Sequence, residues 1–487
     1  MGAPSRFLKL LGTITLINIL SRVFAFLREL FIGYQYGTTY QADSIITAFT
    51  IPNFFHIVLG GAVTTAFISV YGKQQSQVKH DFARTVFTML ALVVGTLTIA
   101  FMLLPSFWME LFFGGMSGDA LALTEKLFRL TAPATFFLVV GIALSGLHNV
   151  YGHYRLSTTS TFLFNALYLI IGAGLTPWLS AYSYSLGAAL GAAAMFGFLV
   201  YFIRKRNLMP LKPKLVRMPQ NKRFLKLALP LMLGGATMQF YQLIQRMFAA
   251  PLDNGAIAAL NYASKMTQMP QAVLMTSVTT MIYPMLTKAA GEGDQTKITN
   301  AYQKGFRLLT LLLLPASAFL VIYAKDIMTF ILQYGAFSTD STSATYPLLQ
   351  IYAIAVLGLA LNTYITRFFY AAEKTVLPVA LNVLSVIGIN ILVIILFREQ
   401  LGAEAIALGT AISAIINMLL LIICARWQLK LNVSSHRFIG KIILYTAAAT
   451  AALWLVSLLP FTLALLSLAT GGITLLLIIG TGIKLVH

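Results

Sequence analysis

Apolar runs long enough to cross a membrane recur along the whole chain, and they constrain its fold more than any other feature. A helix of about 18 to 20 apolar residues spans the hydrocarbon core of a bilayer. We therefore predict an all-α, polytopic membrane protein with about fourteen transmembrane helices. The spans are expected at about residues 8–34, 43–70, 84–108, 127–150, 157–179, 183–203, 224–248, 256–285, 301–323, 344–369, 376–397, 402–425, 438–459 and 463–484.

The composition agrees with this class. Of the 487 residues, 58% are hydrophobic and only 10% are charged, whereas a soluble protein carries about 25% charged residues. The net charge of +20 comes mostly from loops on the side that holds the N-terminus. This is the positive-inside pattern, so we expect both termini in the cytoplasm and contacts with anionic membrane lipids. No nucleic-acid partner is predicted.

Motifs for covalent chemistry are missing from the sequence. There is no GxxxxGK[ST] pattern for ATP hydrolysis and no HExxH zinc motif. Cys424 is the single cysteine, which excludes an intramolecular disulfide and a cysteine-based metal cluster. We therefore expect a transporter rather than an enzyme, with no cofactor and no metal site.

The sequence indicates that a unit of six helices is duplicated along the chain. Several matches recur at an offset of 217 or 218 residues, among them Arg28 with Arg246 and the sequences GIAL and GLAL at Gly141 and Gly358. Such a series at one offset indicates an internal repeat. We predict an N-terminal lobe at 1–203, a basic cytoplasmic linker at 204–223, a C-terminal lobe at 224–429 and two additional helices at 430–487. Because each repeat holds an even number of spans, the lobes form a parallel repeat, with substrate handled between them.

Charged residues interrupt the first apolar run, in the stretch SRVFAFLREL from Ser21 to Leu30. An arginine near the centre of a membrane helix costs roughly 2.5–3.5 kcal/mol on insertion scales, so Arg22 and Arg28 need compensation. Glu29 lies seven residues after Arg22 on nearly the same helical face, and we expect it to form an ion pair with Arg22. The plainer alternatives are a purely structural ion pair for Arg22 and a place at the outer interface for Arg28.

The second span adds polar groups at several depths. Asp43 lies near its outer end, and Asn53 and His56 follow at mid-depth. A lone histidine is often a satisfied core residue, but His56 comes directly after a helix break and near the two arginines. We therefore place Asp43, Asn53 and His56 among the substrate-binding residues.

Candidate hinges accompany these groups. Pro52 removes a backbone donor and bends its helix, while Gly60 and Gly61 loosen the next turn. In the second half, Pro270 occupies the corresponding position, and Lys265 precedes it by five residues. Both halves thus direct cations toward the expected interface. Because arginine binds phosphate through two parallel hydrogen bonds, buried cations without matching carboxylates indicate an anionic ligand.

The stretches SRVFAFLRE and ADSIITAFTIPNFF resemble the MurJ (MviN) lipid II flippase family of the multidrug/oligosaccharidyl-lipid/polysaccharide exporter superfamily. The family has similar sequences at three further places, which are YASKMTQMP from Tyr262, LQYGAF from Leu332 and FYAAEKTVLPV from Phe369. The resemblance therefore covers essentially the whole chain. It implies a two-lobed, fourteen-helix fold with a cationic cavity. It also implies that undecaprenyl-pyrophosphate-linked peptidoglycan precursor moves from the inner to the outer leaflet of the bacterial cytoplasmic membrane by alternating access.

Carried over by position, Arg22 and Arg28 match two essential arginines of the family, and Asp43 matches its early acidic residue. Lys265 and His56 stand where the family usually has arginine. The acidic residue usual beside the second-half cation is Ser264, and the glutamate before the Gly-Ala pair is replaced by glycine.

Some family members bind sodium through carboxylates between the seventh and eleventh helices. Those helices here offer amides and hydroxyls instead, so we predict no sodium site; the residues are Gln239, Gln242, Asn382, Ser385 and Asn390. With no ATP motif, we expect the membrane potential to drive transport. We expect the protein to function as a monomer.

Three other functions stay open from the sequence. The chain could flip another polyprenyl-pyrophosphate-linked oligosaccharide, such as a capsule or O-antigen unit. A cation-coupled drug exporter is the second, although such exporters carry acidic cavity residues where this cavity is predicted to be cationic. The third is a membrane enzyme or scaffold.

Overall fold

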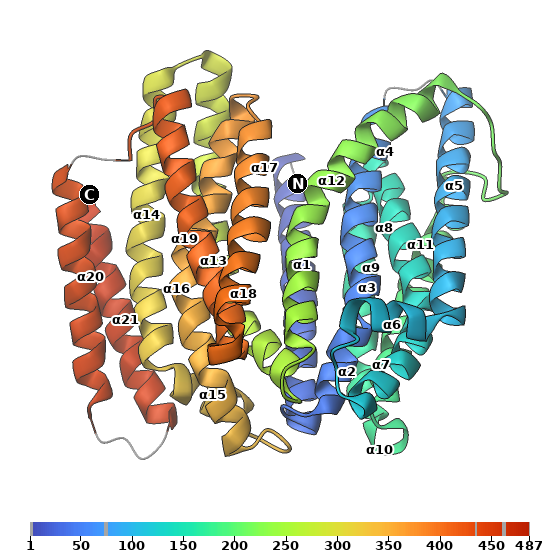
Figure 1. Cartoon of the computed structure of the whole chain (residues 1–487). Coiled ribbons are helices and arrows are strands. Elements are labelled where there is room, and N and C mark those ends of the chain that lie inside the picture. Colours follow the sequence, from blue (N-terminus) through green and yellow to red (C-terminus); the bar gives the residue numbers. More distant parts are fainter. Residues whose placement is uncertain (1–2, 73–75, 434–435, 460–463, 487) are drawn as a thin grey trace. The chain divides into compact units, whose positions relative to one another are not determined.

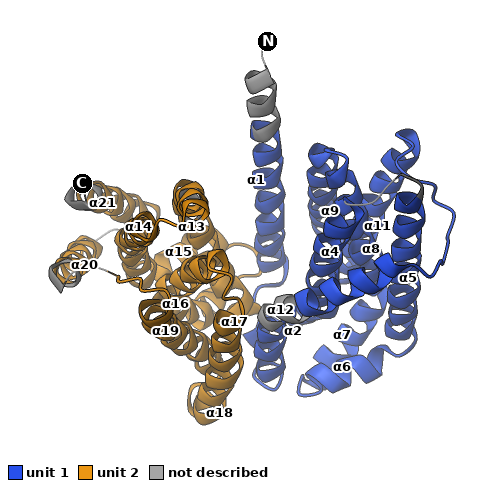
Figure 2. Cartoon of the chain, turned by 90° about the horizontal axis from the view of Figure 1, so that it is seen from above, with its two compact units in different colours: residues 1–257 blue, residues 258–487 orange. Residues whose placement is uncertain are grey.

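The computed structural model describes residues 3–72, 76–433, 436–459 and 464–486 as helices joined by short connections (Figure 1). No strand occurs among these residues, which confirms the predicted all-α class. The chain divides into two compact units, residues 1–257 and 258–487 (Figure 2). This division does not test the predicted lobe boundaries, which stay a prediction.

The first unit begins with a long helix and ends with another. Its elements are α1 (Ala3–Tyr36), α2 (Tyr40–Ala48), α3 (Thr50–Phe55), the π-helix η1 (His56–Gly60), α4 (Gly61–Tyr71), α5 (Ser76–Leu103), α6 (Pro105–Phe113), α7 (Gly118–Thr131), α8 (Pro133–Val150), α9 (Tyr154–Gly174), α10 (Thr176–Leu179), α11 (Tyr182–Lys205) and α12 (Pro219–Ala249).

The second unit contains the remaining helices, the first of which starts at the end of the first unit. They are α13 (Ala256–Glu292), α14 (Gln295–Ile322), α15 (Ala324–Leu332), α16 (Thr339–Ala371), α17 (Val376–Asn382), the π-helix η2 (Val383–Ile389), α18 (Asn390–Leu401), α19 (Ala403–Gln428), α20 (His436–Ser457) and α21 (Ala464–Val486).

Eleven helical stretches in the described part of the chain are long and apolar enough to cross a membrane, which confirms a polytopic protein. Three further helices, α1, α12 and α13, have 34, 31 and 37 residues and are not among the eleven. They carry Arg22 and Arg28, Arg246, and Lys265. The predicted number of about fourteen spans stays a prediction.

Two glycines from the predicted repeat each lie at a contact between two helices of their own unit. A Cβ on Gly141 of α8 would lie 2.6 Å from the Met195 side chain of α11. A Cβ on Gly358 of α16 would lie 3.0 Å from the backbone of Ala414 in α19. Gly358 therefore permits a close approach of two backbones, whereas Gly141 makes room for the end of a methionine side chain. The internal repeat stays a prediction.

The helix predicted at 43–70 is broken near its middle. Helix α2 ends at Ala48, four residues before Pro52, whose nitrogen cannot donate to the Ala48 carbonyl. The chain resumes as α3 and then widens into the π-helix η1. Such single π turns in α-helices occur frequently at functional sites.

The linker between α11 and α12 is fixed to α5. The backbone N–H groups of Lys214 and Val216 donate to the hydroxyls of Thr88 and Thr85, both at 3.2 Å. Two more bonds tie this segment down, from Arg84 Nε to Lys212 O at 2.7 Å and from Lys214 Nζ to Asp81 Oδ2 at 2.6 Å. We call residues 210–218 the strap.

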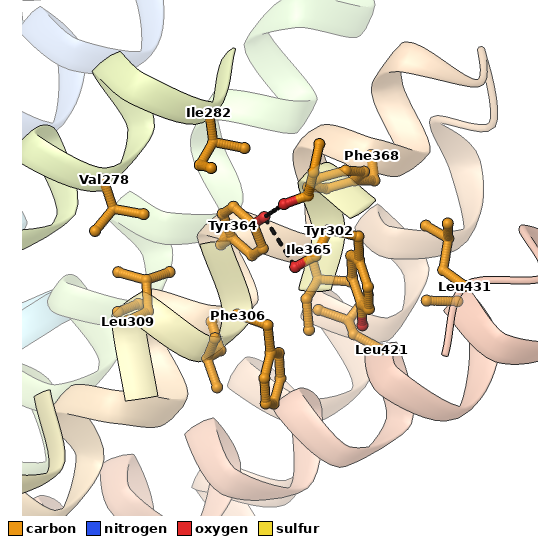
Figure 3. Close-up of a cluster of buried hydrophobic side chains, with 14 of the residues drawn as sticks. Val278, Ile282, Tyr302, Phe306, Leu309, Tyr364, Ile365, Phe368, Leu421 and Leu431 are labelled. Atoms are coloured by element: carbon orange, nitrogen blue, oxygen red, sulfur yellow. Dashed lines mark hydrogen bonds between the residues drawn. The ribbon is translucent and has the colours of Figure 1, made fainter. Parts of the chain in front are cut away.

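The core of the second unit gathers around Tyr364 of α16 (Figure 3). Its hydroxyl donates to the carbonyls of Ala301 and Tyr302 in α14, at 2.9 and 3.1 Å. The Phe368 ring meets Tyr302 edge-on, with centroids 5.2 Å apart. These contacts hold α14 against α16.

Candidate functional site

The site in the first unit depends on how α1 is fixed along α9. Near the middle of α1, Ser21 accepts a hydrogen bond from Asn165 Nδ2 at 2.9 Å. Near its end, Gln35 Nε2 donates to the Ala173 carbonyl at 3.0 Å. Arg28 lies between these two attachments, so its backbone position is well defined.

The Arg28 guanidinium has both an aromatic and an acidic neighbour. Its Cζ lies 4.3 Å from the ring centroid of Tyr168 and 5.9 Å from that of Phe49. Its Nη2 donates to Glu29 Oε1 at 2.7 Å, and the two side chains are only 13% and 9% exposed. Burying a charge is costly unless it is paired. The ring and the carboxylate therefore explain how α1 can hold an arginine at this depth.

A second arginine approaches the same place from α12. Arg246 Nη1 donates to the Thr50 hydroxyl and, at 3.3 Å, to the Ile46 carbonyl, both next to the break between α2 and α3. The charges of Arg28, Glu29 and Arg246 all act on the Tyr168 phenol. We call Arg28, Glu29, Arg246 and Tyr168 the Arg28 cluster. The sequence reading did not include Arg246 in the site, although its repeat match to Arg28 was the signal that could have found it.

Arg22 lies apart from this cluster. It is exposed and forms no hydrogen bond or ion pair with another described residue of its unit. Its neighbour Ser21 is buried against α9, so Arg22 follows on a different face of the helix. The expected Arg22–Glu29 pair is therefore wrong: Glu29 binds Arg28, because the Arg28 side chain folds across Tyr168 toward it. A substrate-binding role for Arg22 stays a prediction.

Asp43 holds a turn of the backbone. It is 4% exposed, and its Oδ2 accepts a hydrogen bond from the Gly255 N–H at 2.6 Å. Gly255 has a φ of +95° and packs against the Thr38 carbonyl, a conformation and a contact that suit glycine alone. The carboxylate thus fixes the turn after α12, and substrate binding by Asp43 stays a prediction.

The other polar residues of the broken helix are half-buried. Asn53 lies in α3, and His56 begins η1. Gly60 ends η1 and packs against Ile142 of α8, whereas Gly61 has open space where a Cβ would stand. The predicted hinge residues Pro52, Gly60 and Gly61 therefore flank an irregular turn, and their movement stays a prediction.

The predicted site residues of the second half lie in the second unit. Lys265 is half-buried in α13, and the hydroxyl of its neighbour Ser264 donates to the Asn261 carbonyl at 3.0 Å. The helix continues through Pro270 without a break. The roles of Lys265 in binding and of Pro270 as a hinge stay predictions.

Buried amides and hydroxyls line the contact of η2 and α18 with α19. Asn417 Nδ2 donates to Asn382 Oδ1 at 2.6 Å. Ser385 and Asn390 are fully buried, and their side chains find no hydrogen-bond partner among the described residues. In that part of the chain no group of three or more histidine, cysteine or acidic side chains is placed to hold a metal ion.

An apolar hollow of about 710 Å³ opens on the second unit between α14 and α20. Leu314 of α14 forms one wall, and Ile442, Ile443 and Trp454 of α20 line the other. Its lining is almost entirely apolar, so its chemistry suits a hydrocarbon chain.

Comparison with known proteins gives one consistent result. The family model described as lipid II flippase MurJ matches residues 32–480. A lipid II flippase MurJ from Burkholderia cenocepacia is 26% identical over 429 residues, which cover 85% of this chain and 83% of that protein. A probable lipid II flippase MurJ from Rhizobium meliloti is 28% identical over 425 residues, covering 84% of this chain and 78% of that protein.

Solved structures show the same fold. A lipid II flippase MurJ in an inward closed conformation superposes with a TM-score of 0.84 at 22% identity, covering 96% of this chain and 97% of that one. An inward-facing multidrug transporter of the MATE family has a TM-score of 0.73 at 15% identity, covering 85% of this chain and 94% of that one. The family match over most of the chain confirms the resemblance seen in the sequence, and the chain belongs to the lipid II flippase MurJ family.

Proposed function

We propose that this protein is a flippase for lipid II, which it carries from the inner to the outer leaflet of the bacterial inner membrane for cell-wall synthesis. The observation that carries the proposal is the Arg28 cluster: in a chain of this family, half-buried Arg28 lies over the Tyr168 ring, and half-buried Arg246 binds the chain at the nearby helix break.

The Arg28 cluster suits a diphosphate. A guanidinium offers five N–H donors in a planar fork, the geometry that binds phosphate oxygens in pairs. Among the described residues of the first unit, only Glu29 accepts a hydrogen bond from Arg28, so most of its donors stay available. Arg22 is a further cation on α1. In this proposal the diphosphate contacts Arg22 and Arg28 one after the other as it crosses the membrane.

We assign the remaining predicted residues to substrate binding as well. In the second unit Lys265 offers a cation to the anionic substrate, and in the first unit Asn53 and His56 supply polar contacts for the sugar portion. Asp43 keeps the turn after α12 in place.

The hydrocarbon tail has a suitable surface of its own. Each buried CH₂ group contributes about 0.8 kcal/mol of binding free energy. The apolar hollow between α14 and α20 would hold part of a polyprenyl chain while the charged headgroup is handled elsewhere.

The family and the apolar helices make the chain a multi-pass protein of the bacterial inner membrane and a transporter. As finer proposals, both termini lie in the cytoplasm and the protein works as a monomer, with anionic lipids around its basic loops. The membrane potential drives transport, since moving one charge across it yields about 2.3 kcal/mol per 100 mV.

Purified protein reconstituted in liposomes tests this function. We expect lipid II to cross the bilayer in wild type and to cross at least tenfold more slowly in Arg28→Ala and Arg246→Ala, since each loses charge-assisted hydrogen bonds. Arg398→Ala removes an exposed arginine at the end of α18 and serves as the matched control.

A capsule-type polyprenyl-pyrophosphate glycan is the competing cargo in the same assay. If that lipid crosses faster than lipid II while Arg28 is still required, the protein is a flippase for another glycan. If neither lipid depends on Arg28, the anion site itself is wrong.

A further inference from the structure

We infer that the contact of η2 with α19 is a binding site for internal water. The site consists of Asn382, Ser385, Asn390, Gly409 and Asn417, which we call the polar seam. The inference goes beyond the proposed function and does not depend on it, because it concerns helices of the second unit whatever lipid the protein carries. It assigns a neutral ligand to residues for which the sequence predicts no sodium site.

Two contacts between antiparallel segments build the polar seam. Asn417 Nδ2 of α19 donates to Oδ1 of Asn382, the last residue of α17, at 2.6 Å. Asn390 comes eight residues after Asn382, and Gly409 comes eight residues before Asn417. There the Asn390 amide packs against α19, since a Cβ on Gly409 would lie 3.2 Å from Asn390 Nδ2. Ser385 of η2 lies between these two contacts.

The polar seam holds side-chain atoms that are buried without a hydrogen bond. Ser385, Asn390 and Asn417 are all 0% exposed. Within the part of the chain that the structure describes, the Ser385 hydroxyl, both amide atoms of Asn390 and Oδ1 of Asn417 have no hydrogen-bond partner. Burying such groups unsatisfied is costly, and the hydrocarbon around a membrane helix offers them nothing. Proteins commonly satisfy them with ordered water.

The chemistry of the free atoms selects a neutral ligand. They include amide oxygens that accept, an amide nitrogen that donates, and a hydroxyl that does both. A cation would use only the acceptors and an anion only the donors, whereas water uses both. The segments that form the polar seam, residues 376–390 and 409–417, contain no charged residue that would balance an ion.

The backbone beside the polar seam is irregular as well. Residues Val383–Ile389 form the π-helix η2, whose hydrogen bonds reach back five residues and widen the turn. Ordered water and neighbouring side chains let membrane helices tolerate such departures from α-helical geometry. The irregular turn and the unsatisfied side chains lie at the same place, and bound water accounts for both.

Hydroxyl-radical labelling by synchrotron X-rays tests this site in the purified full-length protein in detergent. Radicals formed from a bound internal water modify the side chains next to it, and mass spectrometry identifies them. Residues 383–390 and 409–417 should be labelled at least about fivefold more than the equally buried core segment Tyr364–Phe369. The control is stringent because tyrosine and phenylalanine rings react readily with these radicals. A polar seam labelled no more than this segment overturns the inference.

Variants show whether these side chains hold the water. Ser385→Ala with Asn390→Leu should reduce labelling of the polar seam to the level of the core segment. Asn300→Leu, at an exposed position of α14, is the matched control and should leave labelling unchanged. Labelling that stays at the wild-type level in the double variant overturns the inference. If thermal unfolding shows that the double variant does not fold, Ser385→Ala alone gives the same comparison.

A competing ligand is a sodium ion. Thermal unfolding of wild type in sodium chloride and in choline chloride of equal ionic strength should give the same midpoint if the ligand is water. A stabilisation by sodium that wild type shows and Asn390→Leu lacks would overturn the inference and assign a cation to the polar seam.

Discussion

The Tyr168 ring of α9 lies 4.3 Å beneath the guanidinium of Arg28 in α1, so an aromatic face from one helix supports a cation from another. A cation over an aromatic face gains about 0.5–2 kcal/mol, depending on how far it is removed from water. This contact keeps Arg28 in one orientation, and its contribution can be measured separately from that of Glu29.

Replacing Tyr168 by phenylalanine or by leucine isolates the ring. Tyr168→Phe keeps the aromatic face and should bind inorganic diphosphate about as tightly as wild type. Tyr168→Leu removes the face and should weaken binding by about 2- to 30-fold, the range that corresponds to 0.5–2 kcal/mol. Titration of both variants decides this. Equal losses in the two would show that the hydroxyl, and not the ring, supports Arg28.

Asp43 should contribute to stability through its bond to the Gly255 backbone. Asp43→Asn loses a buried charge-assisted hydrogen bond, so we expect the free energy of unfolding to fall by about 1.5–3 kcal/mol. Thermal unfolding in detergent measures the loss, with Asp119→Asn at an exposed position of α7 as the control. If Asp43→Asn unfolds like wild type but fails to flip lipid II, Asp43 binds substrate, as the sequence predicts.

The two glycines after His56 should respond differently to alanine. Gly60→Ala places a methyl group against the Ile142 side chain and should destabilise the protein by about 1–3 kcal/mol through overpacking. Gly61→Ala meets open space and should be neutral or stabilising by up to about 1 kcal/mol, because alanine favours helix. Thermal unfolding compares them. The double variant Gly60→Ala with Ile142→Ala should recover stability relative to Gly60→Ala, and a lack of recovery would refute the contact.

His153 should make stability depend on pH. Arg206 Nη1 donates to His153 Nε2 at 2.5 Å, which requires the neutral ring. Burial and then the charge of Arg206 lower the pKa of His153. Because the folded state binds this proton less readily than the unfolded state, the contribution is complete above the unfolded pKa of about 6.5 and is lost as the pH falls below it.

Thermal unfolding from pH 7.5 to 5 checks this dependence, read as the difference between wild type and His153→Asn. We expect wild type to be more stable at the upper end and the difference to shrink toward the lower end. A difference that is constant over the whole range would contradict the assignment. Because the His148 ring centroid lies 6.2 Å from that of His153, the same comparison is made in a His148→Asn background. Histidines that do not face His153 contribute equally to both proteins and cancel in the subtraction.

The sequence predicted the long helices well, for a physical reason. Twenty apolar residues in a row have few folded alternatives to a spanning helix. The short helices α6, α7, α10 and α15 were missed, because they lie in segments that were assigned to loops or to the ends of spans. The break at Pro52 follows from its missing N–H, whereas the π turn after it depends on packing that no residue pattern specifies.

The site was predictable only in part. Arg28 was found because a charge within an apolar run is conspicuous. The partner of Glu29 was wrong because helical spacing favours Arg22, whereas the Tyr168 ring from α9 turns Arg28 toward the acid. Arg246 appeared in the sequence only as a repeat match, since nothing in α12 reveals that it lies beside Thr50. Both residues are positioned by contacts between helices that lie far apart in the sequence, and a residue pattern does not reveal such contacts.

The strap has a consequence for biosynthesis. Its partners on α5, Thr85 and Thr88, precede it by 131 and 126 residues, so they are already in the membrane when the strap leaves the ribosome. Fastening the strap there brings the start of α12 to α5, where Phe224 meets Phe82 with ring centroids 6.2 Å apart. Helix α12 can therefore join the first unit before the second has been made. The nascent chain then completes its first unit, together with Arg246 and its contacts to Thr50 and Ile46, without waiting for the remaining helices.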